Sequence, residues 1–202
     1  MNPTEARIQD LIRREIEGIS NIPVNESISK AIELIYEAVH IRKGKVVVSG
    51  LGKAGQIGHN IATTLSSTGT PSVFLHPTEA QHGDLGILQS NDLLFLISNS
   101  GKTKEILELL PLAKRLFPGI KSIALTGHPE NDLGTMADLC LSTGYPKEVC
   151  PLGLTPTTST TVMTVLGDIL VVLMMEKINF TKSDYALRHH SGYLGQKSRG
   201  DE

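Results

Sequence analysis

Three short stretches of the sequence carry residues suited to binding and transforming a phosphorylated metabolite. GLGKAG, at Gly50–Gly55, places Lys53 inside a glycine-rich turn, and SNSGKT, at 98–103, gathers three hydroxyl side chains around a glycine. KEVC, at 147–150, offers a carboxylate beside apolar residues. Hydroxyls and backbone N–H groups at the start of a helix suit a phosphate monoester, and a positioned carboxylate suits proton transfer. Together they predict chemistry on a phosphorylated substrate.

The first stretch also matches the G-x-G-x-x-G pattern of dinucleotide-binding turns. Such a site needs an acidic residue at the end of the next strand to hold the ribose, and this sequence has His76 there. The pattern is not a Walker loop either, because Ala54 follows Lys53 and the required spacing is absent. A phosphate-facing turn and a tight turn that binds nothing both remain open.

The second stretch predicts a phosphate anchor. Ser98, Ser100 and Thr103 follow an apolar run and precede a helical pattern that begins near Lys104, and the Gly101 backbone is expected to add support. The alternative is that the serines only cap that helix. One serine would be explained in this way, whereas three hydroxyls around a glycine favour an anion site.

The elements that must position these residues alternate between strands and helices. Helix-length segments at 56–66 and 104–117 separate the short apolar runs, which is typical of a parallel sheet with helices on both faces. We expect a flavodoxin-like three-layer α/β/α sandwich. Its five parallel strands are predicted at Val46–Val48, Ser72–Leu75, Leu93–Ile97, Ser122–Leu125 and Leu139–Leu141.

Helical patterns flank this region. Apolar residues repeat at helical spacing over 8–19 and 28–39, with Asn25 as the predicted N-cap of the second helix. The chain is therefore predicted to divide into a helical extension packed on the domain, 1–43, and the domain itself, 44–202. Thr155-Pro156 is predicted to open a long helix, whose apolar stretch 162–175 is buried in the core or in a subunit contact. A short helix is expected at 182–188.

Bulk properties exclude several classes of function. The net charge is −2 and the pI is near 6.4. No long basic run is present, so a nucleic acid is not the expected partner. The apolar stretch 162–175 is shorter than a bilayer span and is interrupted by Asp168, so a membrane is not expected either. The two cysteines, Cys140 and Cys150, form no C-x-x-C pair, and the first residues do not form a secretory signal. We expect a cytoplasmic protein without a required metal.

SNSGKT after a parallel strand resembles the phosphosugar loop of sugar isomerase (SIS) domains. HPTEAQHGDLG at 76–86, KEVCPLGLTPTTSTT at 147–161 and ALRHHSGYLGQK at 186–197 narrow the resemblance to the arabinose 5-phosphate isomerases, over about 44–197. The resemblance implies interconversion of ribulose 5-phosphate and arabinose 5-phosphate through an enediol, without a cofactor. In that family the product feeds synthesis of Kdo (3-deoxy-D-manno-octulosonate) and so of lipopolysaccharide.

The resemblance also implies the site. Glu148 is the first choice for the enediol base, with partial burial expected to raise its pKa, although a solvated surface acid is the plainer alternative. Glu105 otherwise reads as a first-turn helix acid, and His82 as a structural histidine. The implied catalytic set is Glu148, His189, Lys53, Glu105 and His82. The implied substrate-binding set is Ser98, Ser100, Gly101, Thr103, Gly69, Thr70, His76 and Gly52, with His76 also able to bind an inhibitory zinc ion.

The sequence departs from the family near its end. RHHSGYLGQ stands where the family has S-H-P-G-G-x-L-G-R. His190 is therefore an alternative to His189 as the functional histidine. The resemblance implies a homotetramer, in which His189 is expected to act on a neighbouring subunit. Many relatives carry two C-terminal CBS domains, whereas this sequence stops at Glu202. A feedback inhibitor such as CMP-Kdo is therefore expected to bind at the active site itself.

Two other functions stay open. One is an SIS isomerase for another sugar phosphate, such as a hexose phosphate, and the other is a non-catalytic sugar-phosphate-binding regulator. The regulator is disfavoured because Glu148 and His189 are present and the first 43 residues form no basic helix-turn-helix.

Overall fold

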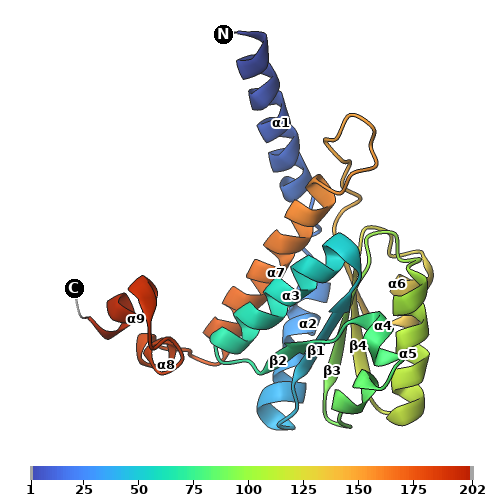
Figure 1. The fold of residues 1–202 in the computed structure, drawn as a ribbon, viewed down its shortest axis with the longest axis vertical. Helices are drawn as coiled ribbons and strands as arrows, with labels where there is room; N and C mark the ends of the chain where they lie inside the picture. Colours follow the sequence, from blue (N-terminus) through green and yellow to red (C-terminus); the bar gives the residue numbers. More distant parts are fainter. Residues whose placement is uncertain (1, 201–202) are drawn as a thin grey trace.

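A five-stranded parallel sheet forms the centre of the fold (Figure 1). The computed structural model describes residues 2–200. The strand order is β2-β1-β3-β4-β5, the flavodoxin-like order, which confirms the predicted fold class. All five predicted strands are present, at β1 Val46–Gly50, β2 Ser72–Phe74, β3 Leu93–Ile97, β4 Lys121–Thr126 and β5 Leu139–Ser142.

Helices cover both faces of the sheet, so the strands read as continuous apolar runs. Every residue of β1 and β3 is buried, and alternate side chains enter two separate apolar clusters. One face is covered by α2 Glu26–Tyr36, the π-helical turn η1 Glu37–Ile41, α3 Gly52–Ser67 and α7 Thr158–Lys177. The other is covered by α4 Pro77–Ala80, the 3₁₀ turn η2 Asp84–Ile87, α5 Lys104–Leu116 and α6 Asp132–Met136.

Two helices begin elsewhere than predicted. α3 begins four residues earlier, at Gly52, directly after β1. α7 begins at Thr158, and Thr155-Pro156 lies in the exposed loop before it, because the Glu148 carboxylate accepts the N–H groups of Thr157 and Ser159 and so fixes the helix start further along. α7 is long and apolar enough to cross a membrane, yet it packs on α2 and α3 as the expected core helix.

The N-terminal helices differ in how they join the domain. α2 starts after the N-cap Asn25, as predicted, and buries Ala31, Ile32 and Ile35 in the main core. α1 Pro3–Ser20 contacts α7 near its end and otherwise projects from the body (Figure 1). The division into 1–43 and 44–202 stays a prediction, although α2 shares the core of the domain.

The C-terminal segment also projects from the body (Figure 1). The predicted short helix is present as α8 Lys182–Ala186, and a second helix, α9 Gly192–Arg199, was not predicted. The reason is that α9 contains two glycines and shows little amphipathic pattern. It contacts α8 rather than the sheet.

Candidate active site

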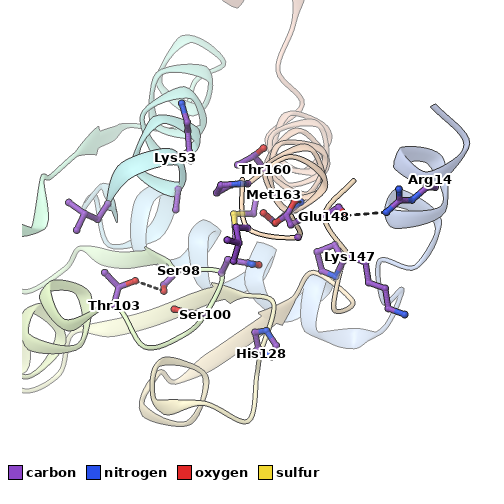
Figure 2. Close-up of a pocket in the computed structure, with 18 residues that line it drawn as sticks. Arg14, Lys53, Ser98, Ser100, Thr103, His128, Lys147, Glu148, Thr160 and Met163 are labelled. Carbon is purple, nitrogen blue, oxygen red and sulfur yellow. Dashed lines mark hydrogen bonds between the residues drawn. The ribbon is translucent and has the colours of Figure 1, made fainter. Parts of the chain in front are cut away.

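The main cavity opens at the carboxyl edge of the sheet. Its volume is about 740 Å³, and it is lined by the loops that follow β1, β3, β4 and β5 together with the first turns of α7. The connection from β1 runs to β2 on one side, whereas the connection from β3 runs to β4 on the other, so the loops after β1 and β3 diverge and leave a crevice. Open α/β sheets bind ligands at such switch points. Figure 2 shows the side chains that line the cavity.

The loop after β3 presents hydroxyl groups to this cavity. Ser98, Ser100 and Thr103 all line it, and the Ser98 and Thr103 hydroxyls are hydrogen bonded to each other at 2.7 Å (Figure 2). Thr103 is the N-cap residue of α5, but its side chain makes no capping hydrogen bond. The start of α5 therefore keeps backbone N–H groups for a ligand, which suits an anion. The structure brings these three predicted residues together.

Gly101 shapes the turn after β3. Its N–H donates to the Ser98 carbonyl at 3.1 Å, and a contact of its backbone with a phosphate stays a prediction. Gly101 has φ +65°, and a Cβ there would lie 3.2 Å from Oγ1 of Thr126 and 3.1 Å from Cβ of Asn131. Glycine is needed for the left-handed turn and for the close approach to β4.

Glu148 faces the same cavity from the loop after β5. Its Oε2 accepts hydrogen bonds from the Thr157 N–H at 2.7 Å, the Thr157 hydroxyl at 2.9 Å and the Ser159 N–H at 3.3 Å. These donors surround the start of α7, where the helix dipole favours a carboxylate. All three of these bonds use Oε2.

The expected pKa shift of Glu148 has the wrong sign. Partial burial acts to raise the pKa of this carboxyl, but the hydrogen bonds from Ser159 and Thr157 together outweigh it and hold the pKa below its usual value of 4.5. Glu148 is consequently ionised at neutral pH. It is ready to accept a proton, but it is a weaker base than a carboxylate of raised pKa.

Lys53 also lines the cavity, from the first turn of α3. Its side chain is exposed and, within residues 2–200, forms no ion pair with an acidic residue. Lys53 brings positive charge to the wall of the cavity, and in Figure 2 its side chain points away from the hydroxyls of the loop after β3. Lys53, Ser98, Ser100, Thr103 and Glu148 are thus the predicted residues that meet at one cavity.

Two other predicted residues lie at a neighbouring hollow. Gly52 and His76 line a space of about 480 Å³ together with His59 and Phe74. Gly52 has φ +59° at the start of α3, and His76 is exposed before α4. Their role in binding a substrate or zinc stays a prediction.

Three predicted catalytic residues lie outside the main cavity of this chain. His82 is exposed between α4 and η2, and Glu105 is half-buried in the first turn of α5 without lining the cavity. His189 lies between α8 and α9, where its ring stacks on Tyr185 at 3.7 Å between ring centroids. A role for His189 therefore needs a neighbouring subunit.

Gly69 and Thr70 lie at the opposite edge of the sheet. They precede β2, and in a parallel sheet the residues before a strand lie at its amino end. Thr70 is buried and its Oγ1 lies 3.3 Å from Nε2 of His40 in a hydrogen bond. Within one chain these two residues lie away from the main cavity, and their part in binding the substrate stays a prediction.

Sequence reasoning missed several residues of the cavity. His128 follows β4, and the rule that ligands meet the carboxyl ends of strands would have indicated it. Arg14 gave no such signal, since it reaches the cavity from α1, over 100 residues from the loop that it contacts. Within residues 2–200, no group of three or more His, Cys, Asp or Glu is placed to hold a metal.

Comparison with known proteins finds a matching family model and several named relatives. Residues 41–173 match the SIS domain family. An arabinose 5-phosphate isomerase of Yersinia pestis is 46% identical over 191 residues, covering 94% of this chain and 56% of that protein. The corresponding Pseudomonas aeruginosa enzyme is 48% identical over 174 residues, covering 86% of this chain and 52% of that protein. The chain spans about half the length of these curated relatives, and the predicted resemblance is confirmed.

Two solved structures cover the whole domain. A Bacteroides fragilis protein, assigned as a phosphosugar isomerase involved in capsule formation, has a TM-score of 0.92 and 62% identity, covering 94% of this chain and 99% of that one. An Escherichia coli CFT073 protein in complex with arabinose 5-phosphate has a TM-score of 0.85 and 37% identity, covering 94% of this chain and 100% of that one.

Proposed function

The chain belongs to the SIS domain family, and from that premise we propose that it is an aldose–ketose isomerase interconverting ribulose 5-phosphate and arabinose 5-phosphate. The observation that carries the proposal is one cavity in which Ser98, Ser100 and Thr103 at the start of α5 face Glu148 at the start of α7. The former group suits a phosphate and the latter a proton transfer. The relatives named as arabinose 5-phosphate isomerases support the choice of substrate.

The proposed chemistry moves one proton between C1 and C2 of the open-chain sugar. The hydroxyls of the β3–α5 loop and the N–H groups of α5 hold the phosphate, and Lys53 adds positive charge near the phosphate or the enediolate oxygen. Glu148 removes the proton from one carbon and returns it to the other, while the hydroxyl proton moves from one oxygen to the other through solvent, so that carbonyl and hydroxyl exchange places. No electron leaves the substrate, so the proposed reaction requires no redox cofactor.

A product assay tests this function. The purified protein is incubated with ribulose 5-phosphate, and the sugar phosphates are followed by NMR. We expect arabinose 5-phosphate to accumulate to equilibrium. Formation of ribose 5-phosphate alone would contradict the substrate assignment, and turnover of a hexose phosphate instead would favour the alternative SIS isomerase. Binding without any turnover would favour a sugar-phosphate-binding regulator.

We also propose that the active form is a homo-oligomer, a tetramer by resemblance. Ile8, Ile12 and Ile16 are each more than half exposed at i, i+4 and i+8 on the projecting helix α1, a face that a second copy would cover. His189 would then reach the site from a neighbouring chain. Sedimentation equilibrium tests the assembly, and mixing an E148Q variant with an H189A variant tests the shared site. Regained activity is the expected result, whereas two variants that stay inactive together would contradict sharing.

The pathway and regulation follow from the same proposal. We place the enzyme in the cytoplasm, where its product feeds Kdo and lipopolysaccharide synthesis, with CMP-Kdo as a feedback inhibitor bound at the active site. The cavity of about 740 Å³ is larger than a pentose phosphate needs and supports room for such a ligand. Competitive inhibition by CMP-Kdo in the isomerase assay is the expected outcome, and unchanged rates at millimolar CMP-Kdo would refute it.

A further inference from the structure

We propose that Arg14 on α1 is a positioning residue for Glu148, which makes a helix outside the matched SIS region part of the active site. The family match covers residues 41–173, whereas α1 spans Pro3–Ser20. The inference rests on the proposed function only in that Glu148 is taken as the base. The contact itself is independent of that assignment.

The contact joins parts of the chain that are 134 residues apart. Nη2 of Arg14 donates a hydrogen bond of 3.1 Å to the main-chain carbonyl of Glu148 (Figure 2). Arg14 is half-buried and lines the main cavity. Its neighbour Arg13 is exposed and pairs with Asp10 and Glu17 on its own helix. Arg14 forms no ion pair with any described residue, so its guanidinium is committed to the loop of Glu148.

Two further contacts hold α1 in the position that this hydrogen bond requires. The Thr158 hydroxyl donates to Oε1 of Glu15 at 3.0 Å. Gly18 lies so close to α7 that a Cβ there would be 2.5 Å from Cγ2 of Thr158. α1 is thus fixed against the first residue of α7, the same helix start that holds the Glu148 carboxylate.

The end of α1 also contacts the start of the loop after β5, which carries Glu148 and is called the catalytic loop below. Gly144, two residues after β5, has φ +78°, and a Cβ there would lie 2.2 Å from the carbonyl oxygen of Asn21. Asn21 directly follows α1. The loop from Gly144 to Glu148 is therefore held by α1 at both of its ends.

These contacts fix both halves of Glu148. Arg14 holds its main chain, while Thr157 and Ser159 hold its carboxylate. Without the guanidinium, the Glu148 carbonyl loses its partner and the loop can move. A displacement of about 1 Å costs a reaction on the order of 100-fold. The phosphate loop after β3 makes no hydrogen bond to α1 among the described residues, so substrate binding should change little.

The kinetic test compares an R14M variant with an R13M variant. We expect R14M to lower kcat about 10- to 100-fold while KM stays within about threefold. R13M removes a charge of the same type one residue away and should stay within about twofold of the wild type. R14K keeps a donor and should recover part of the lost kcat. Equal kinetics for R14M and R13M would overturn the inference.

A second readout does not depend on activity. The Glu148 carboxyl is titrated by ¹³C NMR, with its signal identified by comparison with an E148Q variant. In R14M the pKa of Glu148 should rise toward 4.5, because a looser loop weakens the hydrogen bonds that lower it. An R14A variant, which also lacks the donor, preserves the test if R14M does not fold. An unchanged titration in both variants would overturn the positioning role, whereas a wild type that fails to isomerise any pentose phosphate would refute the proposed function alone.

Discussion

The two edges of the sheet use similar polar groups in opposite ways. At the amino edge, Asp92 is fully buried and its carboxylate accepts from Nζ of Lys45 at 2.7 Å and from the Gln89 N–H at 2.8 Å. At the carboxyl edge, Lys53 has no acidic partner among the described residues, and the start of α5 has no side-chain cap. The amino edge satisfies its charges internally, and the carboxyl edge leaves donors for a ligand.

Smaller contacts repeat this difference. At the amino end of β4, Asp138 accepts from the Ser122 N–H at 2.9 Å and from the Ser122 hydroxyl at 2.7 Å. Ser100, after the carboxyl end of β3, lines an open cavity instead, and its hydroxyl donates to no described residue. Paired polar groups join neighbouring strands, whereas unpaired donors around a cavity mark a place for an anion. The comparison predicts that substitutions at one edge affect stability and at the other activity.

The largest expected effect is on catalysis at the carboxyl edge. An E148Q variant keeps the shape of the side chain but cannot accept the substrate proton. We expect kcat to fall by about 10²–10⁴-fold, the usual contribution of a general base, with little change in KM. Steady-state kinetics with ribulose 5-phosphate measures it. Turnover within threefold of the wild type would exclude Glu148 as the base.

The largest expected effect on stability is at the amino edge. A D92N variant places an amide group against the Lys45 ammonium and the Gln89 N–H, which leaves a partly buried cation without its counter-charge. We expect the free energy of unfolding to fall by about 3 kcal/mol, at the lower end for a broken buried pair because Lys45 keeps some solvent contact. Urea unfolding measures this loss.

The control for D92N is kcat, which should stay within about twofold, because Asp92 lies at the opposite edge from the cavity. An S100A variant should show the reverse behaviour, with a raised KM and an unchanged free energy of unfolding. A D92N variant with normal stability and lowered kcat would break the comparison between the two edges.

Removal of the unpaired cation should give an intermediate effect. A K53M variant loses a charge-assisted contact to the phosphate or enediolate, worth about 1.5–3 kcal/mol, so kcat/KM should fall about 10- to 100-fold. Stability should not change, because the Lys53 side chain is exposed. Lys102 is also exposed, and it lies in the loop after β3 without lining the cavity, so K102M is the matched control. Equal losses for both variants would indicate only a general charge effect.

The smallest effect concerns the two cysteines. Hydrogen bonds from Thr155 lower the pKa of Cys150 in the catalytic loop to about 6, whereas burial and the Glu130 charge raise the pKa of Cys140 on β5. Thiolate is the reactive form, so the rate at which iodoacetamide alkylates Cys150 should rise around pH 6. This rate should be close to its plateau by pH 7. Mass spectrometry of each peptide measures both rates. Equal rates for the two cysteines at pH 7 would contradict this difference.

Much of the fold could be predicted from the sequence because its signals are local. Each strand of the parallel sheet is a short apolar run, and β1 and β3 are buried on both faces, as such runs require. The start of α7 could not be predicted, since it depends on a carboxylate that lies nine residues before Thr157. α9 lacks a clear apolar period, so it gave no signal.

Site residues that directly follow a strand could be predicted from the sequence. Ser98, Ser100 and Thr103 follow β3 directly, and the structure brings them to the cavity with Lys53 and Glu148. Thr70 was assigned by resemblance alone, and within one chain it lies at the amino edge of the sheet, away from the cavity. Arg14 could not be found, because its contact depends on how α1 packs on α7.

The central claim is that Glu148 at the carboxyl edge moves a proton of a phosphopentose, and isotope exchange tests it most directly. Wild type and E148Q are incubated with arabinose 5-phosphate in D₂O, and the sugars are examined by NMR. The account predicts ribulose 5-phosphate with deuterium from the solvent at C1 and deuterium at C2 of the recovered arabinose 5-phosphate, because a carboxylate exchanges its proton during an enediol step. It predicts near-complete loss of both in E148Q. Isomerisation by the wild type without deuterium uptake, or full exchange by E148Q, would contradict it.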